Sequence, residues 1–192
     1  MTVLYKGVGV GTFLYGASPR TEFRARMPTL PGNVDSIMRH VALGTTASPY
    51  ISLTRSYGVA EGYARDAGRA FPTHAQPAYV YEFDISTPLP SAIVEVIDPV
   101  AEVAARNQNP LLPISYHHDG TADFLLGVID PNTMAAHLNA VIRTPKGSAP
   151  TPRPAKLTIE LETIVRALRD AEVLVRGVIS NADVTIIRHE VW

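Results

Sequence analysis

Three hydroxyl side chains at alternate positions, Ser52, Thr54 and Ser56, are the first residues of the sequence that could do chemistry. A serine nucleophile needs a neighbouring base and a supporting motif such as Gly-x-Ser-x-Gly, and the sequence has no such motif. Taken alone, Ser52 and Thr54 are interpreted as hydroxyls at the end of a strand, and Ser56 as a helix cap.

Two carboxylates near the end of the chain, Asp170 and Glu172, are separated by one residue. Alternate residues of a strand face the same side, so we expect both carboxylates on one strand face. An ionised carboxylate beside a substrate can stabilise positive charge that appears in a transition state. Taken without other motifs, Glu172 is a surface carboxylate at a strand start and Asp170 marks a helix end.

Two further patterns suggest ligand binding, but each lacks the other residues or elements that such a site needs. Adjacent His117 and His118 would point to opposite faces of a strand, and no third ligand is visible, so we expect no metal site. The absence of cysteine excludes disulfides and thiolate sites. The glycines at 7, 9 and 11 lack a following helix, and Glu22 comes too soon for a dinucleotide fold. They indicate a bulged strand, or flexible backbone near a ligand.

Short strands and helices are expected to position these groups. Proline clusters mark loops between them, the longest at 144–154. Strands are expected at 3–5, 50–53, 78–84, 92–97, 172–176 and 184–189. Helices are expected at 33–40, at 57–66, from Pro99 onward, at 134–142 and at 158–169. This irregular order predicts an α+β domain with mixed sheets.

The order of these segments resembles that of the bacterial mono-ADP-ribosyltransferase toxins, in the cholera- and pierisin-like group with Arg, Ser-x-Ser and Glu motifs. Val3-Leu-Tyr-Lys6-Gly7 stands where the first motif is expected. The stretch 33–64, with a helix bearing His40 and the strand Tyr50-Ile-Ser52-Leu-Thr54, is similar to the middle motif. Asp170-Ala-Glu172-Val-Leu-Val-Arg-Gly177 looks like the third motif. The resemblance covers roughly half of the chain.

The resemblance implies a fold and a domain organisation. It implies a mixed, split β-sheet core of the ADP-ribosyltransferase type with short flanking helices. Residues 1–192 would form a single domain. The stretch from about 87 to 156 is longer than the core of the family needs, so we expect an inserted lobe there.

The resemblance also implies cleavage of NAD⁺ and transfer of ADP-ribose to a macromolecule by a toxin or effector. Glu172 would stabilise the oxocarbenium-like ribose, Ser52 would orient Glu172, and Asp170 would face the incoming nucleophile. The acceptor could then be a guanidinium that needs deprotonation, or another group, including a nucleobase or water.

The resemblance assigns the remaining site residues to NAD⁺ binding. Lys6 and Gly7 would meet the ribose or phosphate, Thr54 would support the cleft, and Tyr63 would stack on nicotinamide. Lys6 departs from the family's arginine, since an ammonium is a point charge rather than a planar fork. Arg20 or Arg24 could be the first-motif cation instead. No metal cofactor is implied.

Composition limits the partners. The chain has 192 residues, 46% of them hydrophobic and 18% charged, and a formal net charge of −1. That balance favours a protein acceptor over nucleic acid. A cognate immunity protein would be a further partner. The sequence shows no ordinary signal peptide and no apolar run long enough for a membrane helix. We therefore expect a soluble protein without membrane insertion, secreted or delivered into a target cell by another route, and otherwise cytoplasmic.

Two alternatives stay open beside the transferase. The same site could use water as the acceptor, which would make the chain an NAD⁺ glycohydrolase toxin. The chain could also be a catalytically inactive interaction module that kept the fold, an alternative that lysine in the arginine position favours.

Overall fold

The structure is a computed structural model of the whole chain and describes residues 2–16, 18–106, 114–118, 123–128 and 159–192. Its elements, in chain order, are β1 (Thr2–Val8), β2 (Glu22–Arg24), α1 (Val34–Met38), the π-helical turn η1 (Arg39–Leu43), β3 (Tyr50–Thr54), α2 (Tyr57–Asp66), β4 (Ala78–Ile85), β5 (Ile93–Ile97), α3 (Pro99–Arg106), β6 (Ile114–His118), β7 (Asp123–Val128), α5 (Ile159–Asp170), β8 (Glu172–Ser180) and β9 (Thr185–Val191).

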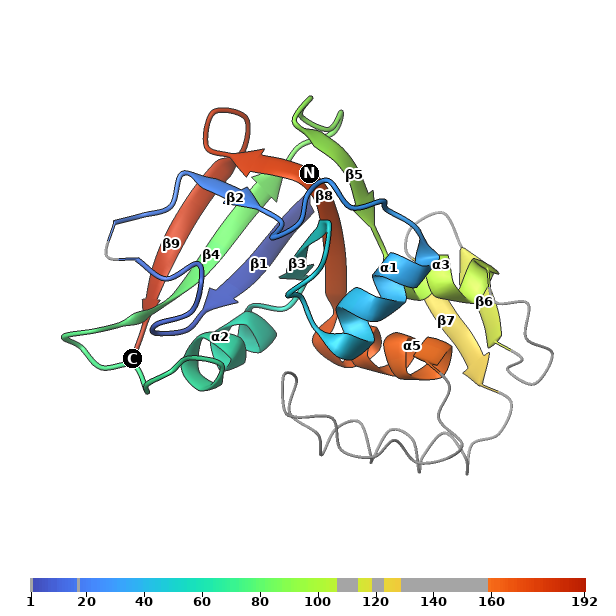
Figure 1. Ribbon diagram of the computed structural model, residues 1–192, viewed down its shortest axis with the longest axis horizontal. Coiled ribbons are helices and arrows are strands. Elements are labelled where there is room, and N and C mark those ends of the chain that lie inside the picture. The colour runs from blue at the N-terminus through green and yellow to red at the C-terminus, as the bar shows by residue number, and fades with distance from the viewer. Residues whose placement is uncertain (1, 17, 107–113, 119–122, 129–158) are drawn as a thin grey trace.

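The main sheet has the strand order β2-β8-β3-β1-β4-β9, and β5 also pairs with β8. The sheet curls, and β6 and β7 form a separate small ribbon (Figure 1). The expected α+β class is confirmed. The expected mixed sheet is wrong for the part of the chain described, because every strand pairing there is antiparallel.

The pairing between β1 and β3, in the middle of the sheet, consists of a single residue pair. β1 pairs with β4 over seven positions, from Thr2 to Val8, whereas its only pairing with β3 is Tyr5 opposite Thr54. The carbonyl groups of β3 on either side of that pair must therefore find other donors.

The two faces of the sheet carry different layers. Alternate residues of β1, β3, β4 and β8 form the largest core cluster, which includes Leu4, Val8, Ile51, Leu53, Phe83 and Val173. On the opposite face, α2 packs over β1 and β4 (Figure 1), while α1, α3 and α5 pack over Tyr50 and Leu174. The side chains of Ser52, Thr54 and Glu172 lie on this helical face because they alternate with core residues of the first cluster.

The glycines at positions 7 and 9 allow α2 and the turn after it to approach β1 closely. A Cβ atom on Gly7 would lie 2.0 Å from the carbonyl oxygen of Ala60, and one on Gly9 would lie 2.6 Å from the backbone nitrogen of Gly68. These glycines are therefore required by packing. The expectation that Gly7 meets a ligand stays a prediction, and α2 packs against this glycine where a Cβ atom would lie.

Local signals placed most helix starts correctly. Asn33 caps α1 through a capping box with Ser36, and Ser56 caps α2, which spans the expected residues. The helix after Asn33 continues as the π-helical turn η1 and ends at Gly44, whose φ of 108° favours glycine. β8 runs to Ser180 and is longer than the expected strand.

The stretch after position 87 begins within the main body. β5 pairs with β8 in the main sheet, and α3 packs against α5. The expected helix at 134–142, and with it most of the expected lobe at 87–156, lies outside the described residues. Within the residues that the structure describes, no helix combines the length and apolar character needed to cross a membrane.

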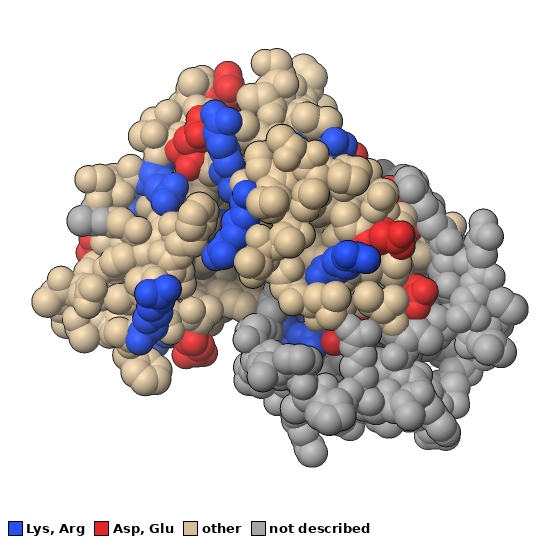
Figure 2. All heavy atoms as spheres, viewed as in Figure 1, with Lys and Arg blue, Asp and Glu red and all other residues tan. Residues whose placement is uncertain are grey.

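Charges of both signs are interspersed on the face shown in Figure 2, where a stripe of basic side chains is bordered by acidic ones. Two arginines of the main sheet have acidic partners, since Arg24 contacts Glu22 and Arg176 lies 3.2 Å from Glu95. Pairing of this kind offsets positive charge.

Candidate active site

The pairing of β3 with β8 brings Ser52 to Glu172. Thr54 lies opposite Glu172 and Ser52 lies opposite Leu174, so Ser52 and Glu172 are diagonal neighbours on one face. The Ser52 Oγ donates a hydrogen bond of 2.5 Å to Glu172 Oε1. Ser52 and Glu172 are therefore in contact, as expected.

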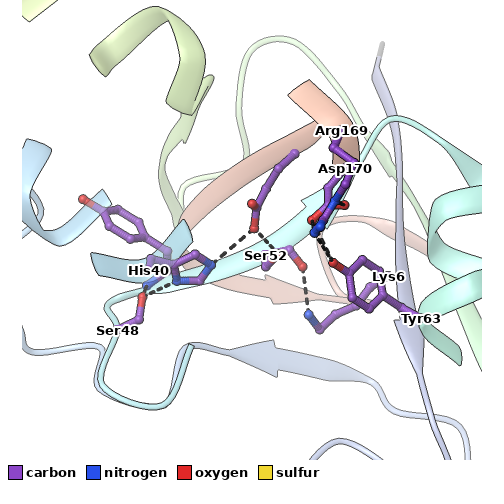
Figure 3. A network of polar contacts seen from close by, with 9 residues as sticks. Lys6, His40, Ser48, Ser52, Tyr63, Arg169 and Asp170 are labelled. Atoms are coloured by element: carbon purple, nitrogen blue, oxygen red, sulfur yellow. Dashed lines mark hydrogen bonds and ion pairs between the residues drawn. The ribbon is translucent and has the colours of Figure 1, made fainter. Parts of the chain in front are cut away.

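Glu172 also has a histidine beside it. The Nε2 atom of His40 lies 3.5 Å from Glu172 Oε1, and the Nδ1 atom of His40 lies 2.5 Å from Ser48 Oγ (Figure 3). His40 comes from η1, and its ring packs edge-on against Tyr50. The π-helical turn thus directs an imidazole at the carboxylate.

Ser48, His40 and Glu172 form a hydroxyl, imidazole and carboxylate series, which raises the question of a serine nucleophile. Ser48 is only 1% exposed, and its oxygen also accepts a hydrogen bond from the backbone N–H of Tyr50. These contacts fix the Ser48 hydroxyl and, through it, the orientation of the His40 ring.

Asp170 is not on the strand that carries Glu172. It is the last residue of α5, and Ala171, with a left-handed φ of 46°, turns the chain before β8 begins. The expectation of a shared strand face is wrong because this turn separates the two carboxylates. The backbone carbonyl of Asp170 accepts a hydrogen bond of 2.6 Å from Thr54 Oγ1, which fixes the turn to β3.

The carboxylate of Asp170 is held by two neighbours (Figure 3). Arg169 donates from Nε to Oδ1 at 2.8 Å and from Nη2 to Oδ2 at 2.9 Å. The Tyr63 hydroxyl donates to Oδ2 at 2.7 Å. Burial raises the pKa of the Tyr63 phenol well above its ordinary value, and the charge of Asp170 raises that pKa further.

Tyr63 and Lys6 both have contacts within the protein. The Tyr63 hydroxyl donates to Asp170, and the expected stacking of its ring on nicotinamide stays a prediction. Lys6 is two residues away from both Leu4 and Val8, so its side chain begins on the core face of β1. Its ammonium donates to the carbonyl oxygen of Ser52 at 2.8 Å, beside the point where β1 and β3 part.

The alternative first-motif cations have other contacts. Arg20 donates to the carbonyl oxygens of Leu14 and Phe13, and Arg24 pairs with Glu22 on the same strand. Of the three cations, the structure brings Lys6 to Ser52.

Sequence reasoning left three members of the site unassigned: His40, Ser48 and Arg169. His40 had a signal, since it stands on the helix before the hydroxyl-bearing strand. Arg169 and Ser48 had no such signal in the sequence. The contact of Arg169 with Asp170 depends on where α5 ends, and the contact of Ser48 with His40 depends on the loop before β3.

The described residues hold no group of three or more His, Cys, Asp or Glu side chains that could bind a metal ion. What they do hold is a carboxylate aligned by a hydroxyl and flanked by an imidazole, an arrangement that can stabilise a cation. Comparison with protein-family models, with curated proteins and with solved structures gave no match.

Proposed function

We propose that this chain is a mono-ADP-ribosyltransferase that cleaves NAD⁺ and transfers ADP-ribose to a macromolecule. The observation that carries the proposal is the hydrogen bond between Ser52 Oγ and Glu172 Oε1, formed across 120 positions of the sequence. Both residues were assigned from motif order alone, and their contact is what that assignment requires.

The chemistry needs little from the protein beyond one aligned negative charge. The bond between ribose C1′ and the nicotinamide nitrogen breaks, and nicotinamide leaves with the electron pair, which cancels its own positive charge. The ribose becomes oxocarbenium-like, and Glu172 stabilises that charge. The acceptor then forms a bond to C1′ and loses a proton.

The surrounding residues act as supports for Glu172. Ser52 fixes one carboxylate oxygen, and Lys6 holds the backbone of Ser52 from the other side of the strand. His40 flanks the same oxygen at 3.5 Å. β1 and β3 are joined by a single residue pair, which supports the split-sheet type of fold proposed with this activity.

Burial of Glu172 sets a condition on this proposal. The residue is only 2% exposed, so NAD⁺ must displace neighbouring side chains to reach the carboxylate. Binding of NAD⁺ would therefore be coupled to an opening at this site.

The same burial favours a second candidate, an NAD⁺ glycohydrolase. Water reaches an enclosed carboxylate more easily than a macromolecular acceptor does. The residues and the first chemical step would be the same, and free ADP-ribose would be the product.

The two candidates are separated by the fate of the label from NAD⁺ labelled in its ADP-ribose part. The protein is incubated with this NAD⁺ and with cell lysate, beside a Glu172→Gln control. Label on a macromolecule supports the transferase, and free ADP-ribose alone supports the glycohydrolase. Intact NAD⁺ with the parent protein would contradict both.

A further inference from the structure

Arg169, Asp170 and Tyr63 form a compact polar cluster, here called the Arg169 cluster, next to the Ser52–Glu172 pair (Figure 3). Arg169 and Asp170 end α5, and Tyr63 comes from α2. Glu172 follows two residues after Asp170, and its charge acts on the Tyr63 phenol, so the cluster lies beside the proposed site. The proposed mechanism assigns no role to this cluster.

The negative charge of Asp170 is already matched inside the cluster. Arg169 binds both carboxylate oxygens, a two-point geometry that makes arginine–carboxylate pairs strong and specific. Tyr63 donates a further hydrogen bond to one of these oxygens. A second guanidinium could use this carboxylate only by displacing Arg169.

The exposed fractions of the two side chains also indicate that the Asp170 carboxylate is poorly accessible. The Arg169 side chain is 22% exposed, whereas that of Asp170 is 8% exposed. The part of the pair that reaches solvent is therefore mainly the Arg169 side chain, and the Asp170 carboxylate lies largely behind it.

We infer that the acceptor of ADP-ribose is an uncharged nucleophile and that the Arg169 cluster excludes guanidinium acceptors. This inference rests on the proposed function. An uncharged O–H or N–H group bonds to C1′ as nicotinamide leaves with the electron pair, and its proton passes to solvent. A guanidinium would have to lose a proton before attack, and the Asp170 carboxylate that could accept this proton is held by Arg169.

The test uses NAD⁺ with agmatine, a small guanidinium compound, and measures nicotinamide release and ADP-ribosyl-agmatine separately. We expect the parent protein to release nicotinamide and to form no agmatine adduct. Arg169→Gln removes the positive charge, and the ratio of adduct to nicotinamide released should rise at least about tenfold. Arg169→Lys keeps the charge and should exclude agmatine as the parent does.

Arg65→Gln is the matched control, since Arg65 forms an exposed ion pair with Glu61 on α2. It should behave as the parent. An agmatine adduct formed by the parent protein would overturn the inference while leaving the proposed function intact. Equal exclusion of agmatine by Arg169→Gln, with nicotinamide still released, would also overturn it. Absence of nicotinamide release from the parent would overturn the proposed function and this inference with it.

Discussion

Ser52 on β3 and Glu172 on β8 are joined by a hydrogen bond although 120 positions separate them in the sequence. The register of the two strands makes this contact, because Thr54 lies opposite Glu172 and places Ser52 on the adjacent diagonal. A slip of one residue in this register would turn Ser52 to the core face and remove the contact. The site therefore depends on the pairing of the central strands.

Loss of the Ser52 hydroxyl should lower NAD⁺ cleavage and the free energy of unfolding, while the protein still folds. Ser52→Ala leaves the buried carboxylate of Glu172 without one charge-assisted donor, which costs about 1 to 3 kcal/mol of unfolding free energy. We expect NAD⁺ cleavage to fall by roughly 10-fold to 100-fold because the carboxylate is less well aligned. Denaturant unfolding and nicotinamide release measure the two effects. Ser180→Ala, at the other end of β8, is the control, and a Ser52→Ala variant equal to it in both would refute the role of Ser52.

Packing of α2 on β1 should depend on Gly7. A Cβ atom there would lie 2.0 Å from the carbonyl oxygen of Ala60, so Gly7→Ala must push α2 away at a cost of about 2 kcal/mol or more. Gly62→Ala is the matched change on α2 itself, where an added Cβ meets nothing within 4 Å. It should stabilise the protein by roughly 0.5 to 1 kcal/mol, since alanine is the better helix former. Similar unfolding free energies for the two variants would contradict this packing.

Alkaline pH should destabilise the protein in part through Tyr63. Burial, and then the charge of Asp170, raise the pKa of this phenol in the folded state. The folded protein thus holds the proton more tightly than the unfolded chain. The resulting stability is complete below the ordinary tyrosine pKa of about 10 and is lost as the pH rises above it.

The measurement is the free energy of unfolding of the parent and of Tyr63→Phe between about pH 9 and pH 11. The decline with pH should be shallower in Tyr63→Phe. Tyr57→Phe, which changes an exposed tyrosine on the same helix, should decline as the parent does. Parallel curves for Tyr63→Phe and the parent would show that Tyr63 does not contribute.

Features set by neighbouring residues were predictable from the sequence. The bounds of α2 follow from the Ser56 cap and the helix-forming run after it, and α1 follows from Asn33. The bounds of β3 and β8 were predicted to within a few residues, so Ser52 and Glu172 were correctly expected on strands.

Features that depend on turns and distant pairing were not predictable. The position of Asp170 was wrong because Ala171 adopts a left-handed conformation that normally favours glycine, so no sequence signal marks the turn. The close packing of α2 on Gly7 was not predicted, because a glycine required by packing and a glycine near a ligand look the same in the sequence. The pairing of β5 with β8 joins residues more than 70 positions apart, and local pattern carries no information on such a pairing.

If the carboxylate of Glu172 carries the chemistry, nicotinamide release should depend on its charge, and Glu172→Gln removes that charge alone. Glutamine keeps the shape of the side chain and can still accept a hydrogen bond from Ser52, but it lacks the negative charge. Glu82→Gln is the control, because Glu82 is a partly buried carboxylate on β4 that contacts His189 at 3.0 Å. We expect NAD⁺ cleavage by the parent and by Glu82→Gln, and a rate at least about 100-fold lower for folded Glu172→Gln. Cleavage by Glu172→Gln at the parent rate, or none by the parent, would contradict this expectation.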